Sequence, residues 1–439
     1  MKAIFILLLC AFCLEEVSAQ VIKKMDEQTW DAIDAACLQN FNAGGLQGMS
    51  VAVVYGGNIA FAKGYGDRNS DGDPFTIYTK SLLASVSKTI TGVLAMRLVE
   101  NNDINLGDAI SQYLPDFSGS GITIRHLLDH QSGIGHYDDC PGGYSGAFNV
   151  SDSYDVVVDC SICFTPPGSE EVYTTFGNTL LGVIISNVGV LEYGLGYQGL
   201  YSAWMRDPGN LGTLEPAFDS SDPDLAEGSE GELYWDDIGW KLPAGGFISD
   251  IVDLADYARG LLNNVFITRA TFDLMMVNQG NTGTPTWDCD DPNDSNDYGL
   301  AFRVSGGNIT DHGFFVWHNG LNDHGYSAYF AVYPNDNGAI VMMTNTGNAA
   351  GTLGDIRNDI HQLLFCAGTR DFTNEIDWTE PRIFEASQTI IGRSEISSTY
   401  DQYIFDAGQT VRCLPGFHVG IGKKFRATIE GCYGNIIPD

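Results

Sequence analysis

The chain has 439 residues, and its 22 basic and 56 acidic side chains give it a formal net charge of −34 at pH 7. A surface so negative repels nucleic acids and anionic membranes, so neither is an expected partner. The length suffices for one large hydrophobic core and a smaller second unit. No segment after residue 19 has the roughly eighteen uninterrupted apolar residues typical of a membrane-spanning helix.

The first 19 residues have the features of a secretory signal peptide. Lys2 makes the start basic, residues 3–14 are apolar, and the small residue Ala19 precedes the expected cleavage site. This pattern predicts a secreted or periplasmic protein. Cleavage removes two of the ten cysteines and leaves eight. An even number in an exported chain predicts disulfide bonds, although the pairing stays open.

Residues 26–41 carry apolar side chains at helical spacing and are predicted to form an amphipathic helix. Two apolar runs follow, at 49–55 and 59–63, and the Gly56-Gly57 pair between them predicts a β-hairpin. A helix followed by a hairpin is therefore expected near the start of the mature chain.

Residues 67–72 admit two interpretations. Their alternating acidic and amide side chains are typical of the first half of a calcium-binding loop. Tyr78, however, stands at the twelfth position, where such a loop has a glutamate. A polar turn is therefore the favoured interpretation, and no metal is predicted for this chain.

Residues 83–90 contain the strongest chemical signal in the chain. Ser85 and Lys88 stand three residues apart at the predicted start of a helix, and residues three apart share a helix face. The Lys88 amine can therefore reach the Ser85 hydroxyl, which is a poor nucleophile until a neighbouring base takes its proton. Burial would lower the pKa of Lys88 and let it exist as the neutral amine. Because this spacing is common by chance, its meaning depends on the motifs that follow.

The middle of the chain is predicted to be largely helical. Residues 122–134 are predicted to form a helix in which His126 and His130 are interpreted as capping or packing residues and not as metal ligands. A long helix follows from Leu180, and another starts after Ser249, the predicted N-cap.

Residues 326–333 and 339–344 are predicted to form a second hairpin, and residues 352–366 a closing helix. A hairpin and a helix at each end of a helical middle predict an α/β (α+β) fold. Its antiparallel sheet is flanked by helices, and a helical subdomain is inserted into the chain. We expect this domain to extend over residues 20–368.

The composition changes after Gly368. Residues 369–388 are predicted to be a linker, and residues 389–439 alternate short strands with glycine turns. The second pattern predicts a small all-β C-terminal module.

Several segments of the chain, in order, carry a family resemblance. Ser85-Val-Ser-Lys88 matches an S-x-x-K motif, residues 122–134 match I-T-I-R-H-L-L-x-H-x-S-G-L at almost every position, and residues 243–249 are similar to P-A-G-G-L-x-S. These patterns resemble the β-lactamase-related serine hydrolases, which include class C β-lactamases, penicillin-binding proteins, D-aminopeptidases and esterases. The resemblance covers about residues 25–366, and it implies a β-lactamase/transpeptidase-like fold.

The resemblance implies a second motif, Y-x-N, six residues after the proline of a Pro-Gly pair. Pro167 places it at Tyr173-Thr174-Thr175, whereas the rival Phe176-Gly-Asn178 fits neither flank. A tyrosine near a lysine can relay a proton, so Tyr173 is expected to be the general base and acid. Thr175 replaces the asparagine and offers only a hydroxyl, which leaves the orientation of Lys88 and of an acyl-amide substrate open.

The third family motif, K-T-G or H-x-G, is similar to His318-Asn319-Gly320. The resemblance implies that His318 assists catalysis, that Asn319 and Gly320 contact substrate, and that the backbone N–H groups of Ser85 and Leu321 form an oxyanion hole. A histidine is largely neutral at pH 7, so it lacks the permanent cation that lysine offers to the carboxylate of a β-lactam.

The tail carries a separate resemblance. Residues 407–417 and 422–429 look like a short β module appended to many secreted bacterial enzymes. This resemblance implies export and no particular chemistry. Cys413 and Cys432 flank the module and could staple so small a core.

The sequence therefore predicts an exported serine hydrolase that acts through a Ser85 acyl-enzyme on a small ester or peptide substrate, such as a D-alanyl peptide, without cofactor or metal. A true β-lactamase is the first alternative, and we expect turnover of β-lactams to be slow or absent. A catalytically silent binding protein on the same fold is the second. The natural substrate and the oligomeric state are left open by the sequence.

Overall fold

The computed structural model describes residues 21–137, 152–159, 165–169, 171–216, 222–230, 238–277, 298–305 and 313–365, together with strands between residues 369 and 428. The chain divides into two compact units, residues 1–358 and 359–439. This boundary lies ten residues before the predicted one, inside the last helix. The predicted signal peptide lies outside the described residues.

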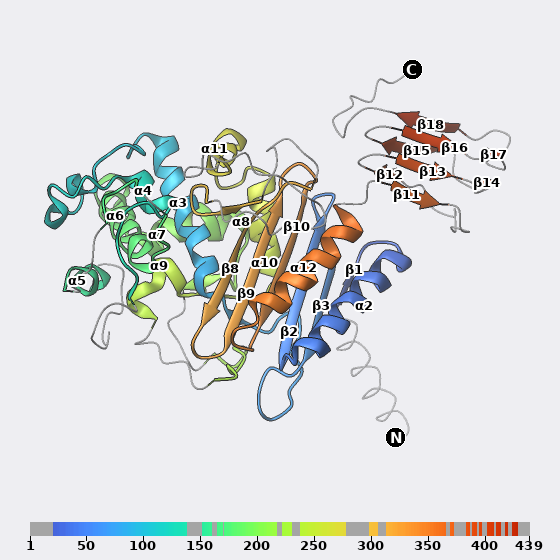
Figure 1. Cartoon of the computed structure of the whole chain (residues 1–439), viewed down its shortest axis with the longest axis horizontal. Coiled ribbons are helices and arrows are strands. Elements are labelled where there is room, and N and C mark those ends of the chain that lie inside the picture. The colour runs from blue at the N-terminus through green and yellow to red at the C-terminus, as the bar shows by residue number, and fades with distance from the viewer. Residues whose placement is uncertain are drawn as a thin grey trace, which may run out of the picture. The chain divides into compact units, whose positions relative to one another are not determined.

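A seven-stranded antiparallel sheet forms the centre of the first unit (Figure 1). Its order is β1-β3-β2-β10-β9-β8-β7, so strands from the two ends of the domain meet where β2 pairs with β10. Its strands are β1 Val21–Lys23, β2 Gly48–Tyr55, β3 Asn58–Gly66, β7 Arg303–Val304, β8 Val316–Asn322, β9 Tyr326–Tyr333 and β10 Gly338–Thr344. The predicted antiparallel fold is confirmed.

Both predicted hairpins are present in this sheet. β2 and β3 pair antiparallel across Gly56 and Gly57, whose φ angles of 57° and 75° suit a tight hairpin turn. The other hairpin joins β9 to β10. Every residue of β9 and β10 is buried, because helices cover both faces of the sheet, and this explains why their sequences are mostly apolar.

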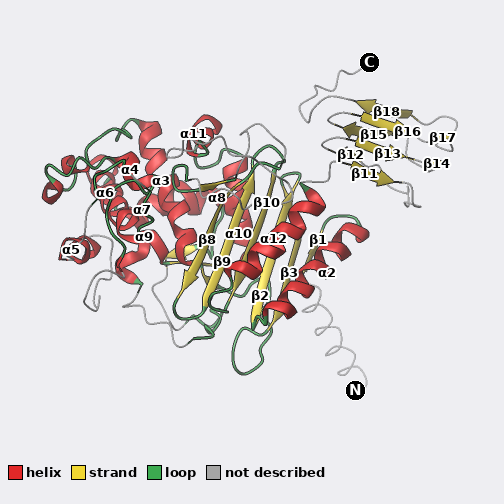
Figure 2. Ribbon diagram, in the orientation of Figure 1, coloured by secondary structure: helices red, strands yellow, loops and turns green. Residues whose placement is uncertain are grey.

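Helices lie on both faces of the sheet and form a subdomain beside it (Figure 2). The helix α10 packs on β2, β3 and β10, while α2 and α12 lie together on the other face (Figure 1). The helices are α2 Glu27–Gly44, α3 Ser87–Asn101, α4 Ile124–Leu128, α5 Asp152–Asp159, α6 Thr175–Tyr193, α7 Tyr197–Tyr201, α8 Asp207–Gly209, α9 Leu242–Gly245, α10 Ile251–Leu262, α11 Arg269–Met275 and α12 Ala350–Leu364.

Short elements connect the subdomain to the sheet. The strand β6 pairs with both β4 and β5 in a second antiparallel sheet. These elements are β4 Ser81–Leu82, β5 Glu215–Pro216, β6 Phe247–Ser249, the 3₁₀ turns η1 Ala84–Val86, η2 Ile110–Gln112, η3 Pro115–Phe117 and η7 Gly239–Lys241, and the π-helical turn η5 Ser202–Arg206.

The helix α6 is the apolar centre of the subdomain. Among the described helices it is the one long and apolar enough to cross a membrane, but 78% of its most apolar 18-residue window is buried inside the protein. The helices α3 and α9 both pack against it. Its hydrophobicity is therefore that of a core helix.

Local contacts bear on two sequence predictions of helix capping. Asp250, not Ser249, is the N-cap of α10, because its side chain accepts the backbone N–H of Asp253. His126 caps α4, as predicted, by accepting the backbone N–H of Thr123. Cys37 is buried in α2, and the disulfide pairing of the eight cysteines stays a prediction. The side chains of the other seven lie outside the described residues.

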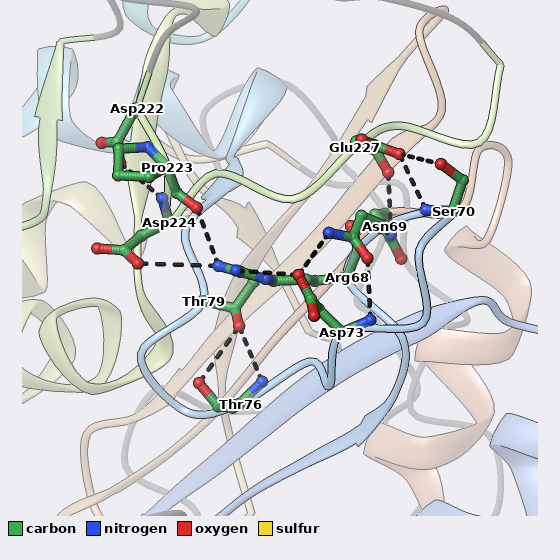
Figure 3. A network of polar contacts seen from close by, with 11 residues as sticks. Arg68, Asn69, Ser70, Asp73, Thr76, Thr79, Asp222, Pro223, Asp224 and Glu227 are labelled. Atoms are coloured by element: carbon green, nitrogen blue, oxygen red, sulfur yellow. Dashed lines mark hydrogen bonds and ion pairs between the residues drawn. The ribbon is translucent and has the colours of Figure 1, made fainter.

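The segment 67–72 is a hydrogen-bonded polar turn (Figure 3). The side chain of Asn69 both accepts from the backbone of Asp73, at 3.0 Å, and donates to its carboxylate, at 2.9 Å. The carboxylate of Glu227 accepts from the backbone and hydroxyl of Ser70 at 2.9 and 3.0 Å. Protein donors therefore occupy the carboxylates of Asp73 and Glu227, and no described cluster of His, Cys, Asp or Glu suits a metal ion.

The strands described in the second unit are parallel. Thr369 pairs with Thr389 and Thr389 with Thr410, so partners lie 20 and 21 residues apart, and the other pairs have similar offsets. Successive coils stack in this way in a parallel β-helix. The strands are β11 Thr369–Phe372, β12 Ile383–Ala386, β13 Thr389–Gly392, β14 Glu395–Ile396, β15 Gln402–Ala407, β16 Thr410–Cys413, β17 His418–Val419 and β18 Lys424–Thr428. The strands β11 and β12 lie within residues 369–388, which the sequence analysis assigned to a linker.

Candidate active site

Ser85 lies in the turn η1, directly before α3. It is the one residue between positions 81 and 96 that is not buried, so it is partly exposed on an otherwise buried element. Ala84 precedes it with a φ of 45°, a conformation that costs a non-glycine residue about 1–2 kcal/mol. The turn is held by hydrogen bonds from the Leu83 N–H to the Phe247 carbonyl, at 2.8 Å, and from the Val86 N–H to the Leu83 carbonyl, at 3.1 Å.

Lys88 lies in the first turn of α3 and is completely buried. Its Nζ lies 3.0 Å from Ser85 Oγ, 2.9 Å from the backbone carbonyl of Ala244 in α9, and 3.4 Å from Thr175 Oγ1 at the start of α6. Burial, with a smaller contribution from the positive charge of Arg303, lowers the pKa of Lys88 to about 7. A large fraction of Lys88 is therefore uncharged at neutral pH.

Tyr173 lies beside this pair. Its hydroxyl is hydrogen-bonded to the Ser85 side chain, and its ring centroid is 5.0 Å from Lys88 Nζ. Burial raises the pKa of Tyr173 to about 12, although the Ser85 hydrogen bond and the charge of Arg303 act in the opposite direction. Tyr173 is therefore a neutral phenol at pH 7, able to donate and relay a proton.

His318 is completely buried, and both of its ring nitrogens have hydrogen-bond partners. Nδ1 lies 2.6 Å from the backbone carbonyl of Asn319, which can only accept, so Nδ1 carries the hydrogen. Nε2 must then accept from the Tyr298 hydroxyl, 2.7 Å away. Burial, followed by the charges of Lys88 and Arg303, lowers the pKa of His318 well below its ordinary value. His318 is therefore a neutral residue that holds Tyr298.

The strand β8 packs against the Ser85 turn, and Gly320 lies at this contact. A Cβ atom at this position would lie 2.1 Å from the Leu83 carbonyl oxygen and 3.1 Å from the Ser85 backbone nitrogen. Only glycine permits this approach. Leu321 follows on the strand with an exposed side chain, and Asn319 is half-buried before it.

The geometry brings together the expected Ser85, Lys88, Tyr173 and Thr175, with His318 behind them. Residues 30–363 match the sequence profile of the family described as Beta-lactamase. The chain belongs to the beta-lactamase family. The resemblance predicted from the motifs is thus confirmed.

Individual members of the beta-lactamase family and its fold relatives agree with this assignment. The chain is 25% identical over 372 residues to PbpX of Bacillus subtilis (strain 168), which is named as a penicillin-binding protein; the match covers 80% of this chain and 83% of that protein. The D-amino acid amidase from Ochrobactrum anthropi SV3 shares the fold with a TM-score of 0.64 at 17% identity, covering 77% of this chain and 98% of its own. The hydrolase EstCE1 shares the fold with a TM-score of 0.62 at 20% identity, and the match covers 76% of this chain and 99% of EstCE1.

Sequence reasoning missed two groups beside the beta-lactamase-family motifs. Tyr298 and Arg303 face each other across a tight turn whose Ala301 N–H donates to the Leu128 carbonyl of α4 at 2.8 Å. The Arg303 guanidinium lies 5.7 Å from the ring centroid of Tyr173 and 5.5 Å from that of Trp317. No sequence motif predicts that these residues lie in the site, because their position depends on how the turn folds onto α4.

Proposed function

We propose that this chain is an exported serine hydrolase that forms a Ser85 acyl-enzyme with small ester or peptide substrates. The observation that carries the proposal is the contact between Ser85 Oγ and Lys88 Nζ at 3.0 Å, because burial leaves that amine able to accept a proton near pH 7. The D-amino acid amidase and EstCE1, a hydrolase with acyltransferase activity, support this chemistry on the same fold.

In this proposal Lys88, rather than Tyr173 as expected from the sequence, removes the Ser85 proton. The pKa of about 7 suits Lys88 to this step, whereas a phenol with a pKa of about 12 is a poor base at neutral pH. The Ser85 oxygen bonds to the substrate carbonyl carbon as its proton moves to Lys88 Nζ. The bond from the carbonyl carbon to the leaving group then breaks. Tyr173, hydrogen-bonded to Ser85, gives its phenol proton to that group and is reprotonated by the Lys88 ammonium, which leaves the Ser85 ester and a neutral Lys88.

The proposed oxyanion hole consists of the backbone N–H groups of Ser85 and Leu321. Its support is the close approach of Gly320 to the Ser85 backbone nitrogen, which brings β8 alongside the nucleophile. His318 acts indirectly in this scheme, because both of its nitrogens are already engaged. It holds Tyr298, whose ring lies 6.5 Å from that of Tyr173.

Covalent labelling tests the central assignment. A fluorophosphonate probe followed by peptide mass spectrometry is expected to modify Ser85, and Ser85→Ala is expected to lower kcat by at least about 10³-fold. A label on Ser87 or Ser132 would show that another serine is the nucleophile. An unlabelled and inactive wild-type protein would favour the silent binding protein.

Arg303 favours a second candidate within the same chemistry, a carboxypeptidase acting on D-alanyl peptides. Among the described residues no carboxylate pairs with Arg303, and its Nε has no hydrogen-bond partner. A guanidinium beside Tyr173 can bind the C-terminal carboxylate of a peptide, which a neutral His318 cannot. In this candidate, Arg303 of β7 supplies the positive charge that His318 of the third motif lacks.

Matched substrates separate these candidates. Arg303→Gln is expected to raise KM at least about tenfold for a D-alanyl-D-alanine peptide, as loss of a hydrogen bond to a charged group does, and to leave KM for its C-terminal amide unchanged. Arg303→Lys retains the charge and is expected to keep part of the difference. An equal effect on both substrates would argue against carboxylate binding. Hydrolysis of nitrocefin with kcat/KM above about 10⁵ M⁻¹s⁻¹ would instead identify a β-lactamase.

A further inference from the structure

Thr175 connects Lys88 to a histidine outside the known motifs. Its Oγ1 lies 3.4 Å from Lys88 Nζ and 3.2 Å from His136 Nε2. Thr175 is 5% exposed, and His136 is half-buried in the segment that follows α4. Thr175, which replaces the family's asparagine, therefore has a hydrogen-bond partner on each side, Lys88 and His136.

We propose that His136 is a positioning residue that orients Lys88 through the Thr175 hydroxyl. In this arrangement His136 Nε2 accepts the hydroxyl hydrogen of Thr175. The Thr175 oxygen then accepts an N–H of Lys88, and the lone pair of the amine is left for the Ser85 hydroxyl. The inference rests on the proposed acyl-enzyme function.

Hydrogen counting shows why the histidine decides the orientation. A neutral amine has two hydrogens and one lone pair, and Lys88 has three polar neighbours. The Ala244 carbonyl can only accept, so it takes one hydrogen. If His136 did not accept the Thr175 hydroxyl hydrogen, Thr175 could donate that hydrogen to the lone pair of Lys88. Lys88 would then donate a hydrogen to Ser85 and could not act as its base. With His136 accepting, Thr175 accepts from Lys88, and the lone pair faces Ser85.

The arrangement also suits the protonated state. When Ser85 attacks, its oxygen bonds to the carbonyl carbon, the π electron pair moves to the carbonyl oxygen, and the proton moves to Lys88. The resulting ammonium has three hydrogens for Ser85 Oγ, the Ala244 carbonyl and Thr175 Oγ1. Thr175 keeps its hydrogen bond to His136 throughout, so this part of the network needs no rearrangement during turnover.

The surroundings hold the His136 ring in place. Its centroid lies 4.1 Å from that of Tyr137, and it is nearly parallel to the Tyr173 ring at 6.3 Å. Lys241 of η7 lies over Tyr137, with Nζ 4.8 Å from the ring centroid. The neighbouring aromatic rings thus restrict the direction in which Nε2 points.

Side chains of similar size that differ in hydrogen bonding test the inference. With p-nitrophenyl acetate and the full chain, His136→Leu and Thr175→Val are each expected to lower kcat at least about tenfold, with KM nearly unchanged. His136→Gln retains an acceptor and Thr175→Ser retains the hydroxyl, so each is expected to lose less activity than the apolar variant at the same position. Thr179→Val is the control, because this buried hydroxyl on the same helix has no hydrogen-bond partner among the described residues.

The double variant gives a readout that a purely structural role would not produce. If the two residues act as one unit, His136→Leu combined with Thr175→Val has the kcat of the worse single variant. Multiplied effects, or equal activity of His136→Leu and His136→Gln, would overturn the inference. Because labelling of wild-type Ser85 is scored separately, its absence would indicate failure of the proposed function and not of the positioning alone.

Discussion

Lys88 is completely buried, and its environment favours the uncharged amine over the ammonium. The pKa falls from its ordinary value of 10.5 to about 7. Between these values the unfolded chain binds more protons than the folded one, so this group makes stability rise with pH across that window. At neutral pH, therefore, burial of Lys88 opposes folding. The same burial keeps part of Lys88 as the neutral amine, which can act as a base.

Replacing Lys88 by methionine is expected to stabilise the fold while abolishing turnover. The advantage of Lys88→Met over wild type in the free energy of unfolding should be larger at pH 7 than at pH 9.5, because the penalty shrinks as the unfolded lysine loses its proton. Denaturant titrations of both proteins at the two pH values measure it. The other titrating groups are common to both proteins and cancel in the difference. A difference independent of pH would mean that Lys88 is charged in the folded protein.

Single residues of the site differ in how far the sequence could predict them. Ser85 and Lys88 belong to one helical turn, so their contact follows from spacing alone. Tyr173 could be predicted only from the family's spacing, which places the second motif six residues after Pro167. Arg303 and His136 reach the site through long-range packing, and neither has a local pattern that a sequence could display.

At the scale of elements, the site depends on the contact between the strand β8 and the turn η1. Gly320→Ala is expected to push β8 away from the nucleophile, because the added Cβ would lie 2.1 Å from the backbone oxygen of Leu83. Backbone atoms cannot give way as a flexible side chain can. Since removal of one oxyanion-hole donor costs about 10²–10³-fold in kcat, a loss of at least about tenfold is expected.

Gly354→Ala is the matched control for Gly320→Ala. Gly354 lies in α12, a Cβ there meets no atom within 4 Å, and alanine is the better helix former. This variant should retain full activity and equal or greater thermal stability. Full activity of a folded Gly320→Ala protein would contradict the proposed position of the oxyanion hole.

Among the elements, those with strong local periodicity could be predicted and those fixed by stacking could not. The hairpins β2–β3 and β9–β10 follow from apolar runs around turn residues. The capping of α10 by Asp250 instead of Ser249 is a one-residue choice that local pattern does not decide. The coils of the second unit pair residues about 21 positions apart, and strand propensity alone does not reveal that period.

At the scale of the whole molecule, the site residues all belong to the first unit. Ser85, Lys88, Tyr173 and His318 lie within residues 1–358, and the second unit forms its own parallel strands. The chemistry is therefore expected to be complete without the C-terminal module.

Two truncations test this independence. A protein ending at Gly368 keeps α12 and is expected to fold and to hydrolyse p-nitrophenyl acetate with the kcat and KM of the full chain. A protein ending at Ala349 loses Arg357, a buried residue whose guanidinium lies 4.6 Å from the ring centroid of Phe315 next to β8, and is expected to unfold. Circular dichroism distinguishes loss of fold from loss of activity. A soluble, folded protein ending at Gly368 that cannot turn over this small ester would show that the module shapes the site.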